Sequence, residues 1–208
     1  MTKNLLYMGR FFVTGHAIIH ITMKKLLWAA FVIFTINICA TIGYYWLFGG
    51  YLGNISLTIS RYVGLEPWSA ATFLACNLAV IALLVFYTTS LQVKRLSWHL
   101  LVCTFAISFL ALSLCPHRPT GDQIITIHRF FASTMFISLC LLAAVTTDLT
   151  KSRLARFFCF IYMFYGFHFI IAYANHLPYL MDNILIWETL FIYGGYVLYL
   201  LPEAKSHN

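Results

Sequence analysis

The sequence predicts an all-α protein: a polytopic membrane helix bundle of about six transmembrane helices, with N-in and C-in topology. Composition, the lengths of the apolar runs and the placement of Lys and Arg lead to this prediction. Of the residues, 62% are hydrophobic and 9% are charged, against roughly 45–50% and about 25% in soluble domains. A soluble fold cannot hide this much apolar surface, so the lipid bilayer is the expected environment.

Six apolar runs approach the length needed to cross a bilayer. The hydrocarbon core is about 30 Å thick and takes about 20 helical residues, because backbone polar groups must be paired inside it. The spans are expected at Leu26 to Phe48, Ser69 to Leu91, Trp98 to Leu114, Ile124 to Thr147, Phe157 to Asn175 and Asn183 to Leu201. They define a transmembrane domain, 23–202, followed by a short cytoplasmic tail, 203–208.

The basic residues alternate between many and few from loop to loop, which sets the orientation. The side predicted to be cytoplasmic has Lys24, Lys25, Lys94, Arg95, Lys151, Arg153, Arg156 and Lys205. The opposite side has Arg61, Arg118 and Arg129. The net charge of +7 is therefore dispersed as a topology signal, and no nucleic-acid partner is expected. Short loops and lysine-rich inner flanks favour a bacterial cytoplasmic (inner) membrane.

The N-terminal extension, residues 1–22, has several interpretations. Met23-Lys24-Lys25 is typical of the start of a membrane-inserted protein, so the extension is read first as an over-long start. The alternatives are an interfacial helix from Leu5 to Ile21 or a seventh span. A cleavable signal peptide is disfavoured, because the apolar stretch after Lys25 is too long and has no good small-x-small site.

Ionisable side chains inside a membrane are costly and face the bundle interior, so they are the candidate functional residues. His168 and Asn175 fall on one face of the fifth helix. Glu188, in the sixth helix, needs either a partner or a raised pKa. His168, His176 or Arg129 could be the partner. Seven residues are expected to gather towards the outer side, with His168 deeper: His117, Arg118, His128, Arg129, His168, His176 and Glu188.

These residues allow three interpretations. They are headgroup contacts and interhelical polar pairs, or a functional site, or a metal or haem site. The functional site is either a pocket for an anionic lipid headgroup or small anion, with Arg118 and Arg129 as donors, or a proton relay through His168 and Glu188. No metal or cofactor is predicted, because the histidine spacing matches no short zinc signature and the six cysteines include no C-x-x-C pair.

The predicted first outer loop carries a family resemblance. It reads Asn54-Ile-Ser-Leu-Thr-Ile-Ser-Arg-Tyr-Val-Gly64 and is followed by Pro67 and a helix. That run resembles an uncharacterised six-span prokaryotic membrane family, domain of unknown function 998, and more distantly the DRAM and Sfk-type membrane proteins. Ser60, Gly64 and His128 stand at the matching positions over residues 26–147, whereas the Cys115 to Arg118 loop departs from the pattern. The resemblance implies no settled activity, but some distant relatives handle lipids or lipid anchors.

The sequence thus favours an integral membrane protein that binds or handles a lipid or small molecule in an outward-facing polar pocket. One alternative is a membrane-embedded enzyme, either a haem or metal oxidoreductase or a hydrolase. Another is a structural or regulatory membrane subunit. The ligand and the oligomeric state are not predicted.

Overall fold

The computed structural model describes the chain over residues 2–90, 95–115 and 122–201. Every regular element in these ranges is a helix, which confirms the predicted all-α bundle. The helices are α1 (Thr2–Phe48), α2 (Ile59–Gly64), α3 (Pro67–Ser90), α4 (Leu96–Leu114), α5 (Asp122–Thr147), α6 (Arg153–Ala174), α7 (Pro178–Met181) and α8 (Ile184–Leu200). Outside the described residues lie Lys94, His117, Arg118, Lys205 and the predicted tail, 203–208.

Five helices in the described ranges are long and apolar enough to cross a membrane. They contain the segments Lys24–Phe48, Pro67–Thr89, Leu96–Leu114, Ile125–Thr147 and Arg153–Ala174. The sixth predicted span, α8, is apolar but has only 17 residues, which at 1.5 Å per residue gives about 25 Å. The chain is therefore a multi-pass membrane protein, and each predicted span coincides with one of the helices α1, α3, α4, α5, α6 and α8, whereas the short helices α2 and α7 lie between spans.

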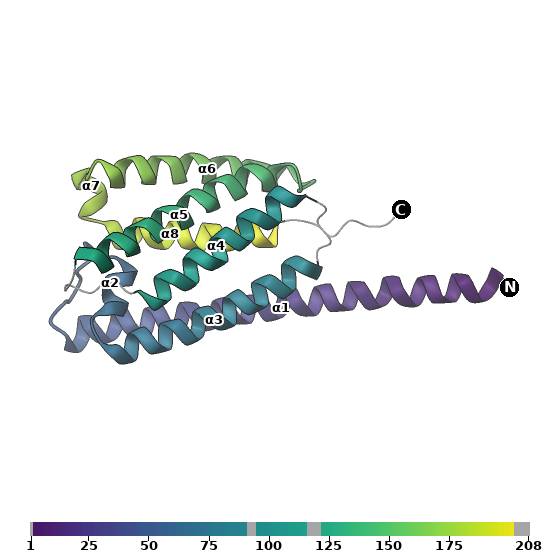
Figure 1. Ribbon diagram of the computed structural model, residues 1–208, viewed down its shortest axis with the longest axis horizontal. Coiled ribbons are helices and arrows are strands. Elements are labelled where there is room, and N and C mark those ends of the chain that lie inside the picture. Colours follow the sequence, from purple (N-terminus) through teal and green to yellow (C-terminus); the bar gives the residue numbers. More distant parts are fainter. Residues whose placement is uncertain (1, 91–94, 116–121, 202–208) are drawn as a thin grey trace.

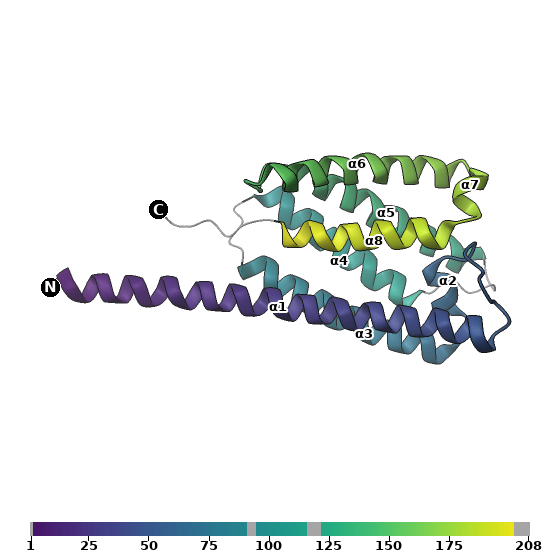
Figure 2. The same cartoon turned by 180° about the vertical axis from the view of Figure 1, so that it is seen from behind.

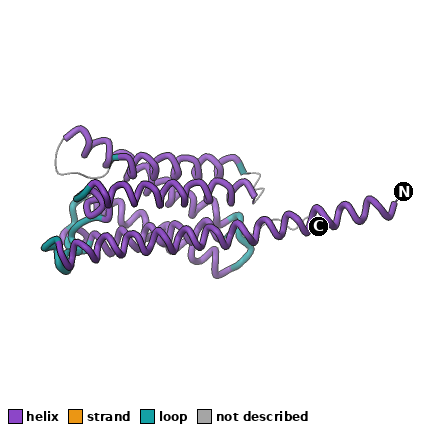
Figure 3. Tube along the Cα trace, turned by 90° about the horizontal axis from the view of Figure 1, so that it is seen from below, coloured by secondary structure: helices purple, strands orange, loops and turns teal. Residues whose placement is uncertain are grey.

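The six long helices run side by side (Figures 1 and 2), with α2 and α7 together at one end of the bundle. At the opposite end, Lys24 Nζ donates to the carbonyl oxygen of Leu200 at 3.3 Å. The first span therefore begins beside the point where α8 ends, as an even number of crossings requires. The view from below in Figure 3 shows α1 projecting well beyond the other helices. No break separates residues 1–22 from the first span, because α1 is continuous from Thr2.

Glycine permits close packing of α6 against its neighbours. A Cβ atom at Gly166 would overlap Cys140 Sγ of α5 and would lie 2.8 Å from Phe191 Cε2 of α8. At Gly195 of α8, a Cβ atom would lie 2.9 Å from Leu139 Cδ1. Small residues let helices approach closely where lipid supplies no hydrophobic driving force between them. This packing sets the relative positions of α5, α6 and α8.

Hydrogen bonds hold the segment between α1 and α3, which contains α2, against one end of the bundle. Tyr62 of α2 is fully buried; its hydroxyl accepts a hydrogen bond from Trp46 Nε1 at 2.9 Å and donates one to the Asn54 carbonyl oxygen. Burial raises the pKa of this phenol above its ordinary value, so the hydroxyl keeps its proton and can donate it in a hydrogen bond. The Leu185 N–H of α8 donates to the Ile55 carbonyl oxygen at 3.0 Å. These bonds hold the start of α2 against α8.

Candidate functional site

A cavity of about 240 Å³ lies between α5, α6, α8 and the start of α2. Its walls combine charged, polar and apolar side chains. They are Thr58, Ser60, His128, Arg129, Ala132, Ser133, Phe136, Phe169, Ile170, Tyr173, Ala174, His176, Ile184 and Glu188. A cavity needs about 10–15 Å³ to hold one water, so this one has room for several waters or one small ligand.

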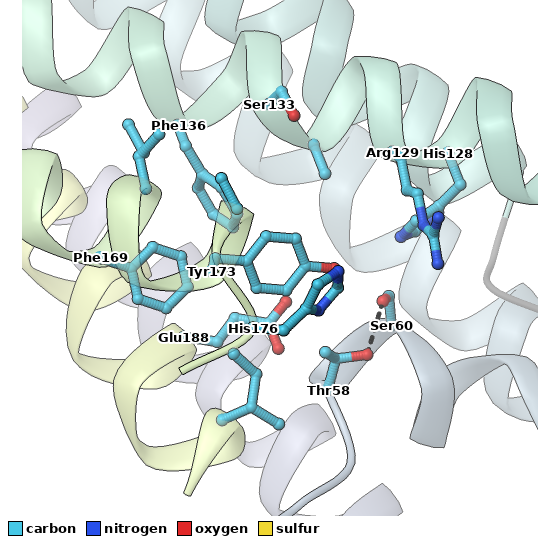
Figure 4. A pocket seen from close by; sticks show the side chains of 14 residues that line it. Thr58, Ser60, His128, Arg129, Ser133, Phe136, Phe169, Tyr173, His176 and Glu188 are labelled. Atoms are coloured by element: carbon cyan, nitrogen blue, oxygen red, sulfur yellow. Dashed lines mark hydrogen bonds between the residues drawn. The ribbon is translucent and has the colours of Figure 1, made fainter. Parts of the chain in front are cut away.

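The α5 wall presents one helical stripe to the cavity, starting with His128 and Arg129 (Figure 4). His128 is only 6% exposed, and its Nδ1 lies 2.8 Å from the Cys115 carbonyl oxygen. A carbonyl only accepts, so Nδ1 carries the proton of this hydrogen bond and fixes the orientation of the ring. Arg129 is exposed and makes no hydrogen bond or ion pair within the described part of the chain.

The α6 wall ends in a turn that places His176 at the cavity. The N–H groups of His176 and Leu177 donate to the carbonyl oxygens of Tyr173 and Ala172, at 3.1 and 3.0 Å. This is the Schellman arrangement, whose left-handed position is usually glycine. His176 occupies it with φ of +50°, a conformation that costs a non-glycine residue about 1–2 kcal/mol. Its ring then lies 6.5 Å from that of Tyr173, beside the cavity (Figure 4).

The α8 wall contributes Glu188, which is 8% exposed. Its Oε2 accepts a hydrogen bond from the Ile59 N–H at 2.7 Å. Of the two alternatives for Glu188, the ionic partner is not found: among the described residues Glu188 forms no ion pair, and the first N–H of α2 donates to it instead. A smaller apolar cavity of about 30 Å³ lies beyond Glu188, and Ser60 also borders both cavities. The hydroxyls of Thr58 and Ser60 are 3.1 Å apart and hydrogen-bonded to each other.

Four of the seven predicted site residues line this cavity together: His128, Arg129, His176 and Glu188. His168 does not, and its predicted position on an interior face is wrong. It lies on an exposed face of α6, where its Nε2 is 2.9 Å from the Tyr179 hydroxyl. Asn175 is also exposed and donates to the carbonyl oxygen of Ile171 at 2.7 Å. His117 and Arg118 lie outside the described residues.

The predicted set of site residues did not include the remaining polar lining residues, Thr58, Ser60, Ser133 and Tyr173. The family resemblance singled out Ser60, but not as a site residue. Spacing carries a signal for one of them, because Tyr173 follows Phe169 by one helical turn and shares its face. Thr58 carries a capping signal, since its side chain accepts from the Arg61 N–H at 3.2 Å at the start of α2. Nothing in the sequence indicates that α2 packs beside α5 and α8.

The cavity walls supply groups that can bind a polar ligand. One arginine, one carboxyl group, two imidazoles and several hydroxyls surround the space. Six apolar side chains line the rest: Ala132, Phe136, Phe169, Ile170, Ala174 and Ile184. Among the described residues, no group of three His, Cys, Asp or Glu side chains is placed to hold a metal ion. The arrangement therefore offers charge pairing and hydrogen bonding to a small polar group beside an apolar wall.

Comparisons with protein-family models, curated proteins and solved structures found no match to this chain. The resemblance of the first outer loop to the six-span family therefore stays a prediction. Of its three matching positions, Ser60 and His128 line the cavity, and Gly64 is buried in α2.

Proposed function

We propose that this membrane protein binds a lipid or another small amphiphilic molecule in the cavity between α2, α5, α6 and α8. The observation that carries the proposal is the gathering of Arg129, Glu188, His128 and His176 around one space with an apolar wall. Charged groups inside a membrane protein are costly and mark binding sites or ion paths. Polar contacts would hold the headgroup, and apolar side chains would contact the parts next to it.

The cavity size favours a headgroup rather than a whole lipid. Pockets for complete drug-sized ligands measure about 300–1,000 Å³, whereas this cavity has about 240 Å³. Large apolar side chains near it are exposed on the bundle surface, among them Phe130 at 65% and Ile171 at 59%. Acyl chains attached to a bound headgroup would therefore lie against these helices, in the bilayer.

The orientation we propose places this cavity on the outer side of the membrane. The end of the bundle opposite α2 and α7 has the described basic residues Lys24, Lys25, Arg95, Lys151, Arg153 and Arg156. Cytoplasmic flanks retain such residues, which supports N-in and C-in topology. A bacterial inner membrane is the proposed location, and the ligand would come from its outer leaflet.

Native mass spectrometry of the gently extracted protein tests the proposal. Ala132 lines the cavity, so Ala132→Phe fills it, whereas Ala144→Phe places the same side chain on an exposed face of α5. We expect the wild type and Ala144→Phe to retain a small-molecule adduct and Ala132→Phe to lose it. Equal retention by both variants, or no adduct on the wild type, would overturn the proposal.

A further inference from the structure

Glu188 has hydrogen-bonding capacity that the protein does not use. A carboxylate accepts about four hydrogen bonds, yet the Ile59 N–H is the one donor that reaches Glu188 in the described structure. The second oxygen, Oε1, accepts no hydrogen bond from the described residues, and the Glu188 side chain borders the cavity. A buried carboxylate is stable when a cation or several donors surround it. The cavity is therefore the place from which a cationic group can reach Glu188.

Arg129 has hydrogen-bond donors without acceptors among the described residues. A guanidinium has five N–H donors and suits phosphate or carboxylate, but none of them is used within the described residues. No nitrogen of Arg129 lies within 4.0 Å of an oxygen of Glu188. In the view of Figure 4, the rings of Tyr173 and His176 lie between the two charged groups. Within the described part of the chain, one cavity therefore has an arginine and a carboxyl group that form no ion pair with each other or with another described residue.

A ligand with a single charge would satisfy only one of these groups. An anion on Arg129 would be repelled by Glu188, and a cation on Glu188 would be repelled by Arg129. A zwitterion satisfies both and keeps the cavity neutral. The accepting groups near Glu188 are its own Oε1 and the hydroxyls of Thr58 and Ser60, which suit an ammonium with N–H donors better than a quaternary one. The Tyr173 ring supplies a face for the same cation.

Building on the proposed function, we propose that the ligand is a zwitterion with a primary ammonium group at Glu188 and a phosphate or carboxylate at Arg129. The ethanolamine phosphate headgroup of a lipid has this chemistry, and so do free phosphoethanolamine and free amino acids. A choline headgroup lacks the N–H donors, and a glycerol phosphate headgroup lacks the cation. The cavity should therefore bind an ethanolamine phosphate headgroup more tightly than a choline phosphate or a glycerol phosphate headgroup.

Titration of the purified, delipidated full-length protein with defined probes tests this ranking, with bound fractions read by native mass spectrometry. The probes are short-chain phosphatidylethanolamine, phosphatidylcholine and phosphatidylglycerol, and free phosphoethanolamine and glycine. We expect phosphatidylethanolamine to bind about tenfold more tightly than the other two lipids. Glu188→Gln should remove this preference, by weakening phosphatidylethanolamine and by strengthening phosphatidylglycerol, whose anion is no longer repelled. Arg129→Gln should weaken both. Glu66→Gln, which changes an exposed carboxylate outside the cavity, is the control and should change neither.

The outcomes separate the two proposals. If the three lipids bind equally well and Ala132→Phe blocks their binding, the zwitterion proposal is overturned, but the proposed binding function is supported. Binding that Ala132→Phe does not block would overturn the proposed function as well. Free phosphoethanolamine or glycine binding as tightly as phosphatidylethanolamine would identify a soluble zwitterion as the ligand, and much weaker binding would identify the lipid headgroup. Glu188→Gln keeps an oxygen that accepts from Ile59, and thermal unfolding checks that each variant is folded.

Discussion

Gly166 lies where α6 packs against α5 and α8, the three helices that form most of the cavity. A Cβ atom there would overlap Cys140 Sγ and come within 2.8 Å of Phe191 Cε2. Overpacking a close contact of this kind costs about 1–3 kcal/mol. At about 2–4 °C per kcal/mol for a chain of this size, we expect Gly166→Ala to lower the melting temperature by about 2–12 °C.

The matched control is Gly43→Ala in α1, where nothing lies within 4 Å of the new methyl group. Alanine is the better helix former by about 0.5–1 kcal/mol, so this variant should be at least as stable as the wild type. Melting temperatures follow from heating the detergent-purified protein and measuring the folded fraction by size-exclusion chromatography. Cys140→Ala removes the overlapping sulfur and should partly rescue Gly166→Ala. Equal stability of Gly166→Ala and Gly43→Ala would refute the packing described here.

Three further predictions concern the loop, the surface and the topology. Tyr62→Phe removes two part-buried hydrogen bonds and should destabilise the protein by about 1–3 kcal/mol, measured as the same thermal shift. The Arg95–Asp148 ion pair, 2.7 Å long, joins side chains that are 45% and 64% exposed; Arg95→Ala should therefore change stability by less than about 1 kcal/mol, and a larger loss in the same assay would contradict this. In intact cells, a membrane-impermeant maleimide should label Ser56→Cys and not Lys151→Cys; the reverse pattern would overturn the N-in orientation.

The spans were predictable because length and composition alone decide whether a helix can cross a bilayer. The fold of the segment between α1 and α3 was not predictable. It depends on bonds between distant parts of the chain, such as the one from the Ile59 N–H to Glu188, 129 residues further on. The donor is a backbone group, which no side-chain pattern reveals. For the same reason, the sequence suggested a cationic partner for Glu188 and missed the actual one.

Four cavity residues were predictable because polar groups stand out in apolar helices. The error with His168 has a physical cause. Its spacing from Asn175 fixes the angle between the two side chains but not which way their shared face points. In a membrane, both the lipid-facing and the interior faces of α6 are apolar, so hydrophobicity does not distinguish them. Packing against α5 and α8 decides the matter, and it turns His168 towards Tyr179.

An experimental structure of the protein in a bilayer of native lipids tests the central claim most directly, because it shows what occupies the space between Arg129 and Glu188. We predict non-protein density in the cavity, in contact with both side chains. For a lipid, this density continues into an acyl chain; for a free zwitterion, it ends within the cavity. A direct ion pair between Arg129 and Glu188, or a cavity filled by the protein's own side chains, would contradict it.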